Sequence, residues 1–254
     1  MVRGSDEFRR SAGPEPLWAD AWEIDFAGEA GVGGFVRLSL LPNQGVAWWW
    51  TSLITPRLVA VRDHEVPLPR GDLLEVRADG LWGELVCETP LEHWSVGLEA
   101  FGIAYDDPAD AWGDEWGERL PVGLDLEWEA TAEPGGLPAA GPDPGPGGVS
   151  YRQPGRVHGE ILVGPDRRIA LEGTGFRSRA SGELDWWSAP LRRRLAWIGR
   201  EDQVSVVDDP ETVDRTVLGE APVLVTAPSM KPARLARALC RVEGKGGGLG
   251  WAEG

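Results

Sequence analysis

Residues 92–106, EHWSVGLEAFGIAYD, decide the fold, because polar and apolar side chains alternate along them with a period of two. One side of such a strand carries residues typical of a core: Trp94, Val96, Leu98 and Ala100. The other side carries His93, Ser95, Gly97, Glu99 and Phe101. The first face is predicted to be buried. The second face either lines a barrel interior or contacts solvent, since sequence alone does not distinguish inside from outside.

The chain around this stretch, from residue 18 to residue 131, has the same character. Short apolar runs are separated by Gly, Pro, Asp and Asn, and helical periodicity is nearly absent. The turn at residues 41–45, LPNQG, predicts a positive φ at Gly45. The spacing favours a β-barrel or β-sandwich. Expected strands cover residues 21–27, 33–42, 45–55, 57–68, 73–79, 81–90, 92–106 and 123–131.

Residues 132–150, AEPGGLPAAGPDPGPGGVS, interrupt this pattern and are interpreted as a linker or a long surface crossover. Short β-type runs resume after them. We therefore predict an all-β protein of two antiparallel β-barrels packed together, the first over residues 17–131 and a smaller one over residues 151–254. Residues 4–8, GSDEF, look like a remnant of cloning and are left out of the fold prediction.

The charge of the chain excludes several partners. Lys and Arg total 25 against 41 for Asp and Glu, so the net charge of −16 would repel a phosphate backbone or an anionic membrane surface. No apolar run approaches the roughly 20 residues of a spanning helix, and the N-terminal residues lack an apolar signal region. We expect a cytoplasmic protein. Cys87 and Cys240 are expected to be buried, reduced thiols, because two distant cysteines support neither a disulfide framework nor a zinc site.

Tryptophan is unusually frequent, with 14 residues against 2 Tyr and 5 Phe. Residues 48–50, WWW, place indoles on both faces of one strand, with Trp48 and Trp50 on one side and Trp49 on the other. Because exposed indole is disfavoured on a monomer, one face should be a core. The other should be either a second packed layer or the wall of a ligand cavity.

Two glutamates are candidates for acid–base chemistry. Glu88 follows Trp82 on one face of the run at residues 81–90, and Glu99 lies on the polar face of residues 92–106. A carboxylate beside indoles is desolvated, and a raised pKa would make it a general acid near neutral pH. The alternative is that both are ordinary surface glutamates in an acidic protein.

The motif search finds no metal or cofactor site. The three histidines at 64, 93 and 158 lack metal-ligand spacing, and no G-x-S-x-G nucleophile elbow occurs. The stretch at residues 28–34, GEAGVGG, lacks the preceding strand and following helix of a dinucleotide site. We therefore expect chemistry without a cofactor.

Several stretches, taken in order, resemble a group of actinobacterial proteins that is similar to the hydroxyneurosporene synthase superfamily, the carotenoid hydratases. The resemblance runs from Trp18 to the end of the chain. It implies two lipocalin-like β-barrels with a lipophilic ligand in or between them, and a likeness in fold to the lipocalin-like Diels–Alder cyclases of polyketide pathways. The stretches that carry it are residues 33–54, 59–69, 81–113, 121–130, 155–164 and 237–253.

One departure from this family bears on the reaction. After a Gly-x-Gly turn the family tends to carry Arg-Asp-His-Ser-Trp-Gly, whereas residues 177–182 here read RSRASG, followed by Asp185, Trp186 and Trp187. The Asp and the His are missing, which argues against hydration of a polyene. A cyclisation that depends on holding reacting carbons together would survive their loss.

These observations favour a cofactor-independent cyclase or isomerase, such as a Diels–Alderase-type pericyclase, that shapes a hydrophobic polyene or polyketide in natural-product biosynthesis. Two alternatives stay open: a terpenoid or carotenoid hydratase or cyclase using a carboxylic acid, with aromatic faces stabilising a cation, and a non-catalytic carrier of a lipophilic ligand. The oligomeric state and the substrate are not indicated. Expected acid–base or hydrogen-bonding groups are Glu88, His93, Glu99 and Arg177; expected pocket walls are Trp48, Trp50, Trp82, Trp94, Phe101, Trp186 and Trp187.

Overall fold

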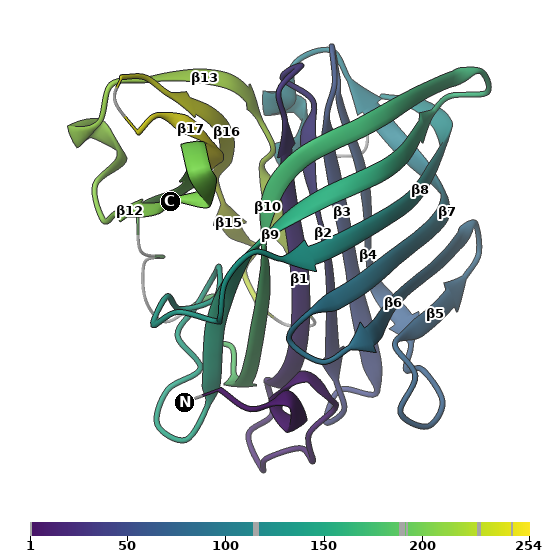
Figure 1. Ribbon diagram of the computed structural model, residues 1–254. Helices are drawn as coiled ribbons and strands as arrows, with labels where there is room; N and C mark the ends of the chain where they lie inside the picture. Colours follow the sequence, from purple (N-terminus) through teal and green to yellow (C-terminus); the bar gives the residue numbers. More distant parts are fainter. Residues whose placement is uncertain (1, 114–116, 188–190, 192, 228–229, 245) are drawn as a thin grey trace.

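The computed structural model describes residues 2–113, 117–187, 191, 193–227, 230–244 and 246–254. The protein is all-β, as the sequence predicts, with short 3-10 segments between strands (Figure 1). These segments are η1 (Gly4–Glu7), η2 (Pro108–Trp112), η3 (Arg200–Asp202) and η4 (Pro210–Thr212). The described residues contain no helix long and apolar enough to cross a membrane.

The first ten strands form one large antiparallel sheet in the order β4-β3-β2-β1-β10-β9-β8-β7-β6-β5. An additional pairing of β4 with β7, in which Leu58 lies opposite Tyr105, closes most of the sheet into a ring. The architecture is therefore barrel-like. The strands are β1 (Trp18–Gly28), β2 (Gly33–Leu41), β3 (Val46–Ile54), β4 (Leu58–Pro67), β5 (Glu75–Ala78), β6 (Leu81–Thr89), β7 (His93–Tyr105), β8 (Glu118–Ala130), β9 (Val149–Val163) and β10 (Arg167–Glu183).

The C-terminal strands form a five-stranded sheet, ordered β12-β11-β17-β16-β13, and a separate two-stranded ribbon of β14 and β15. Figure 1 shows this sheet beside the β9–β10 side of the large sheet. The strands are β11 (Arg194–Gly199), β12 (Val204–Val207), β13 (Arg215–Glu220), β14 (Val223–Val225), β15 (Ala233–Leu235), β16 (Arg237–Val242) and β17 (Gly248–Glu253).

The change from one sheet to the other falls after β10 rather than at residues 132–150. Strands β9 and β10 pair with β8 and β1 and complete the large sheet. The Pro- and Gly-rich segment is thus a long hairpin connection between two neighbouring antiparallel strands of one sheet, rather than a linker or a crossover. Composition marks such a segment as a loop, but it does not encode which strands pair across it.

The barrel interior is a packed apolar core. On β7, the predicted buried face is confirmed, since Trp94, Val96 and Leu98 are all buried. Large indoles from different strands fill the space inside the ring, and each is at most 1% exposed: Trp22, Trp49, Trp94 and Trp128. Tryptophan in this barrel therefore serves packing.

A second core lies between the large sheet and the C-terminal strands. Trp48 and Trp50 point out of the barrel and pack with Trp186 and Trp251 in this layer. The WWW run is thus buried on both faces, with the barrel core on one side and a second packed layer on the other. Gly45 adopts the predicted positive φ, 74°. Both cysteines are free thiols, with Cys240 buried and Cys87 half-buried.

The exclusion of residues 4–8 was wrong. Glu7 is 0% exposed and its carboxylate meets Tyr151, Trp94 and Arg177 inside the large sheet. A charged N-terminal residue looks like a surface residue in sequence. Here three strands of the large sheet, β7, β9 and β10, supply its partners, so the segment is part of the fold.

Candidate functional site

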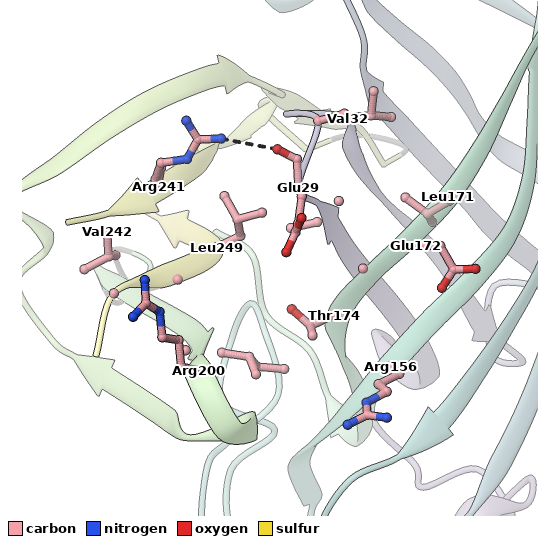
Figure 2. Close-up of a pocket in the computed structure, with 18 of the residues that line it drawn as sticks. Glu29, Val32, Arg156, Leu171, Glu172, Thr174, Arg200, Arg241, Val242 and Leu249 are labelled. Atoms are coloured by element: carbon pink, nitrogen blue, oxygen red, sulfur yellow. Dashed lines mark hydrogen bonds between the residues drawn. The ribbon is translucent and has the colours of Figure 1, made fainter. Parts of the chain in front are cut away.

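A cleft of about 1020 Å³ lies between parts of the large sheet and of the C-terminal sheet (Figure 2). One wall is built from the β1–β2 turn and the outer faces of β9 and β10. The other wall is built from the end of β11 and from β16 and β17. The walls include Glu29, Val32, Arg156, Ile169, Glu172, Thr174, Ile198, Arg200, Arg241, Val242 and Leu249.

Period-two alternation on β10 supplies the first wall. Leu171 points into the barrel core, whereas Glu172 and Thr174 point the other way, toward the cleft. Glycine in β17 shapes the second wall, because a Cβ at Gly248 would lie 2.1 Å from the carbonyl oxygen of Ile198. The glycine-rich C-terminal stretch therefore permits the close strand packing that places β17 beside the cleft.

Two contacts join the walls across the cleft. Arg156 Nη2 on β9 lies 3.0 Å from Asp202 Oδ2 in η3. Arg241 Nη2 on β16 donates to the Glu29 carbonyl oxygen at 3.4 Å, and Figure 2 shows this bond. These contacts are solvent-exposed and individually weak. They leave the volume between the walls open.

The third arginine of the cleft, Arg200, differs from the other two. Its side chain is exposed, and within the described ranges no hydrogen bond or ion pair engages its guanidinium. Figure 2 places Arg200 on the C-terminal wall and Arg156 on the opposite wall. A guanidinium offers a planar fork of donors that matches a carboxylate or phosphate. The cleft can therefore hold an anionic group next to apolar side chains.

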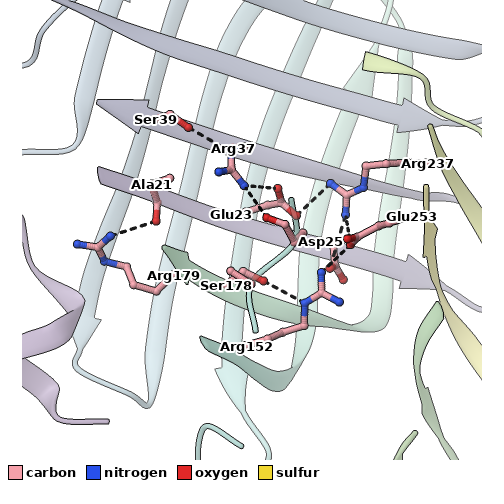
Figure 3. Close-up of polar contacts among 12 residues, drawn as sticks. Ala21, Glu23, Asp25, Arg37, Ser39, Arg152, Ser178, Arg179, Arg237 and Glu253 are labelled. Carbon is pink, nitrogen blue, oxygen red and sulfur yellow. Dashed lines mark hydrogen bonds and ion pairs between the residues drawn. The ribbon is translucent and has the colours of Figure 1, made fainter. Parts of the chain in front are cut away.

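A buried ion network fixes the C-terminal sheet against the barrel (Figure 3). Arg237 on β16 donates to Glu23 on β1 at 3.0 Å, and Arg37 on β2 donates to the other oxygen of Glu23 at 3.1 Å. Arg152 on β9 meets Glu253 on β17 at 2.7 Å. The network thereby sets the position of the second wall of the cleft.

Burial and charge act in opposite directions on the carboxyls of this network. Burial raises the pKa of Asp25 to about 6, although Arg152 and Arg237 oppose the change. For Glu23, burial also favours the neutral form, but Arg237 and Arg37 hold its pKa below the usual value. Direct ion pairing accounts for the difference, since Glu23 has two arginine partners within 3.1 Å and Asp25 has Arg237 at 3.9 Å.

The four predicted acid–base residues are not brought together. Glu88 accepts from Ser95 Oγ at 2.9 Å on the outer, solvent-facing side of β6 and β7. His93 Nε2 lies 2.6 Å from Glu127 on the same face, and Glu99 is exposed there. Arg177 lies across the sheet, inside the barrel, and is 1% exposed. Of the two environments that the sequence left open for the polar face of β7, a barrel interior or solvent, the structure shows solvent.

The predicted aromatic walls divide among three places. Trp48, Trp50 and Trp186 meet in the layer between the sheets, where the Trp50 and Trp186 ring centroids are 5.3 Å apart. Trp187 is half-buried and donates to the Lys231 carbonyl at 2.6 Å. Trp94 lies in the barrel core. Trp82, Phe101 and Glu99 line a hollow of about 1090 Å³ on the outer face of β5 to β9.

His64 belongs to the layer between the sheets. Its Nε2 accepts from Trp50 Nε1 at 2.8 Å, and its Nδ1 lies 3.0 Å from Thr226 Oγ1. Burial, helped by the charge of Arg62, lowers the pKa of His64 to about 4. A neutral imidazole therefore links β3, β4 and the segment after β14, in a structural role.

Residues 177–182, which depart from the carotenoid hydratase pattern, lie on β10. Arg177 and Arg179 face the barrel interior, and Ser178 faces outward and accepts from Arg152 Nε at 3.2 Å. These residues therefore form part of the barrel wall and of the buried ion network. None of them lines the cleft.

Sequence reasoning missed the residues of the cleft. Arg156, Arg200 and Arg241 are isolated arginines with no motif around them. Glycine was the available signal, because residues 28–34, GEAGVGG, and the stretch after Val242 both contribute to the lining. The first lacks the context of a dinucleotide motif, and the second matches no motif in the sequence.

Comparison with known proteins shows the family and the fold. The chain belongs to the family described as "Domain of unknown function (DUF7064)", whose model matches residues 3–207. No curated protein matches the sequence. Among solved structures, a protein from Nitrosomonas europaea described as a "putative ATTH" is similar, with a TM-score of 0.52 and 11% identity over 95% of this chain and 93% of that chain. At that identity the likeness concerns the fold alone.

Proposed function

We propose that the protein binds a lipophilic small molecule bearing an anionic group in the cleft between its two sheets. The observation that carries this proposal is the exposed, unpaired Arg200 guanidinium in a cleft of about 1020 Å³. This volume lies at the upper end of the roughly 300–1,000 Å³ typical of small-molecule sites. The proposal matches the carrier alternative from the sequence, with an anionic head added.

The lining supports an amphipathic ligand rather than a plain hydrocarbon. Val32 and Leu249 offer apolar contacts, while Arg156, Arg200 and Arg241 surround them with guanidinium groups. The lining also contains Glu29, Glu172 and Glu243, so its three arginines balance three carboxylates, whereas the chain as a whole has a net charge of −16. A carboxylate paired with Arg200 would orient the molecule, and its chain would lie along the apolar wall.

A cofactor-independent cyclase or isomerase acting in the same cleft is the second proposal. Two features favour it: the volume suffices for a folded chain, and the carboxylates of Glu29 and Glu172 belong to the lining. Holding a flexible polyene or polyketide acid in a reactive shape can by itself accelerate ring closure. The same carboxylates would serve a hydratase or cyclase that uses a carboxylic acid.

Fluorescence titration with dansyl-labelled undecanoic acid tests binding. We expect saturable binding by the unmodified protein and much weaker binding of the methyl ester, which lacks the charge. Thr174→Trp should block the cleft. Ser95→Trp, a matched change of a half-buried hydroxyl on the outer face of β7, should leave binding intact. Equal binding by both variants would contradict the proposal that the ligand binds in the cleft.

Chromatography of recovered ligands separates the two proposals. Linear polyene and polyketide acids are incubated with the protein, extracted and compared with samples kept in buffer. Return of every tightly bound acid unchanged favours the carrier. Recovery of a cyclised or isomerised product, lost in Thr174→Trp, favours the enzyme, and Glu29→Gln and Glu172→Gln then test the carboxylates.

A further inference from the structure

The N-terminal segment closes one end of the barrel with a buried carboxylate. Figure 1 shows this segment, in purple, across the lower end of the large sheet. Glu7 is 0% exposed, and both of its carboxylate oxygens are engaged. Oε2 accepts from Trp94 Nε1 at 2.9 Å, while Oε1 accepts from the Tyr151 hydroxyl and lies 3.0 Å from Arg177 Nη2.

The aromatic and cationic side chains of this pocket belong to strands of the large sheet. Trp94, Trp128, Tyr151 and Arg177 come from β7, β8, β9 and β10, four consecutive neighbours in the sheet. The Arg177 guanidinium lies 5.2 Å from the centroid of Trp128 and 5.5 Å from that of Trp94. It also donates to Gln153 Oε1 at 2.7 Å. The strands therefore preform a cationic, aromatic pocket around the carboxylate.

This pocket has more donors than Glu7 satisfies. Nε and Nη1 of Arg177 and Nε1 of Trp128 are buried and have no hydrogen-bond partner within the part of the chain that the structure describes. Arg177 is 1% exposed and Trp128 is 0% exposed. Buried donors are normally paired. The surplus indicates a pocket built for an acceptor-rich anion.

The segment that supplies Glu7 is attached mainly through polar contacts. Trp22 Nε1 donates to the Glu7 carbonyl at 2.8 Å, Arg179 donates to the Phe8 carbonyl at 2.9 Å, and the Arg10 amide donates to Asp20 at 2.7 Å. The next side chain along, Phe8, is 51% exposed and adds no core contact. Withdrawal of the segment therefore leaves the apolar core of the barrel intact.

We infer that this end of the barrel is a binding site for a short-chain carboxylate, which the protein's own Glu7 occupies. The side chain of glutamate beyond its Cα has the size of propionate, so a two- or three-carbon organic acid fits the same space. Arg177 pairs with the carboxylate, Tyr151 and Trp94 donate to it, and the segment around Glu7 acts as an internal competitor. The site is separate from the cleft and does not depend on the ligand proposed there.

Chemical rescue in the full chain tests the inference. Glu7→Ala empties the pocket, and added sodium propionate should raise its thermal unfolding midpoint saturably and change its tryptophan fluorescence, whereas sodium chloride at equal ionic strength should not. Glu7→Gln keeps the side chain in place and should show no propionate response. Glu7→Ala combined with Arg177→Met should lose the response. Identical behaviour of Glu7→Ala and Glu7→Gln would overturn the inference.

Limited proteolysis of the unmodified protein gives a second test that does not require the variant to fold. Propionate that displaces Glu7 frees the N-terminal segment, so trypsin should cut after Arg9 and Arg10 faster in propionate than in equimolar chloride. Cleavage elsewhere should keep its rate. An unchanged rate after Arg9 and Arg10 would count against displacement.

Discussion

The barrel interior and the cleft both combine arginine with apolar side chains, but different groups occupy them. In the barrel, Arg177 is buried against Trp94 and Trp128 and pairs with Glu7 of the same chain. In the cleft, Arg200 is exposed and no described group pairs with it. In the barrel a side chain of the same chain occupies the site beside the arginine, whereas the cleft presents unfilled volume. In this fold, the tryptophans of the barrel serve packing, and the open volume lies beside the glycine-rich strand β17.

The largest expected effect is the loss of stability on truncating a tryptophan in the barrel core, which distinguishes a packed barrel interior from an open one. Trp49→Ala should lower the free energy of unfolding by about 4 kcal/mol, because removing a buried indole leaves a cavity. Phe101→Ala, on the outer face and 53% exposed, should change it by less than about 0.5 kcal/mol. Urea unfolding measures both. A small loss in Trp49→Ala would mean that the barrel already contains empty space.

The next effect concerns the network that positions the cleft wall. Arg237→Ala should cost about 3 kcal/mol, because it removes a partner of the buried Glu23 carboxylate. Arg241→Ala, four residues along the same strand and exposed, should cost less than about 0.5 kcal/mol. Urea unfolding of the two variants gives the comparison. Equal losses would show that the network does not hold the sheets together.

The pH dependence of stability tests Asp25. Its pKa is about 6 in the folded protein and near the ordinary aspartate value of 3.8 when unfolded. Between these values the folded state binds the proton more readily, so the contribution of Asp25 to stability falls as pH rises from about 4 to about 6. Asp25→Asn should remove this slope. The free energy of unfolding of the variant and the parent is measured at several pH values. If both change with pH by the same amount, the shifted pKa is contradicted.

Substitution of Arg200 should have the smallest effect on stability and a clear effect on ligand binding. Arg200→Ala should weaken binding of dansyl-labelled undecanoic acid about tenfold, the loss of one charge-assisted hydrogen bond. Its free energy of unfolding should stay within about 0.5 kcal/mol of the parent. Arg156→Ala offers a matched control, since Arg156 already pairs with Asp202. A larger loss of affinity in Arg156→Ala would move the anion site to the other wall.

The sequence predicted the strands and their buried faces better than it predicted which strands pair. Alternation over residues 92–106 identified the buried side of β7, and the WWW run identified a strand buried on both faces. It did not predict that β9 and β10 join the N-terminal strands, because strand pairing over long separations leaves no local pattern. The division at residues 132–150 followed composition, which reports loops.

Candidate site residues were harder to predict for the same reason. Glu99 and His93 carry suitable chemical groups, but their function depends on which side of a sheet faces a cavity. In the sequence Glu7 resembles a surface residue, and only the structure shows that three strands supply contacts to its carboxylate. Arg200 begins the short 3-10 segment η3, which reaches the cleft only through the packing of the C-terminal sheet beside the barrel. Each of these depends on contacts between distant parts of the chain.

Photo-crosslinking tests directly whether the cleft is the ligand-binding site. A fatty acid with a diazirine in its chain is bound to the unmodified protein, irradiated, and located by peptide mass spectrometry. The account predicts labels in residues 27–32, 169–174, 198–200 and 241–249, and their loss in Thr174→Trp. Labels confined to the barrel core near Trp22 and Trp128, or to the outer face of β7, would contradict the cleft as the ligand site.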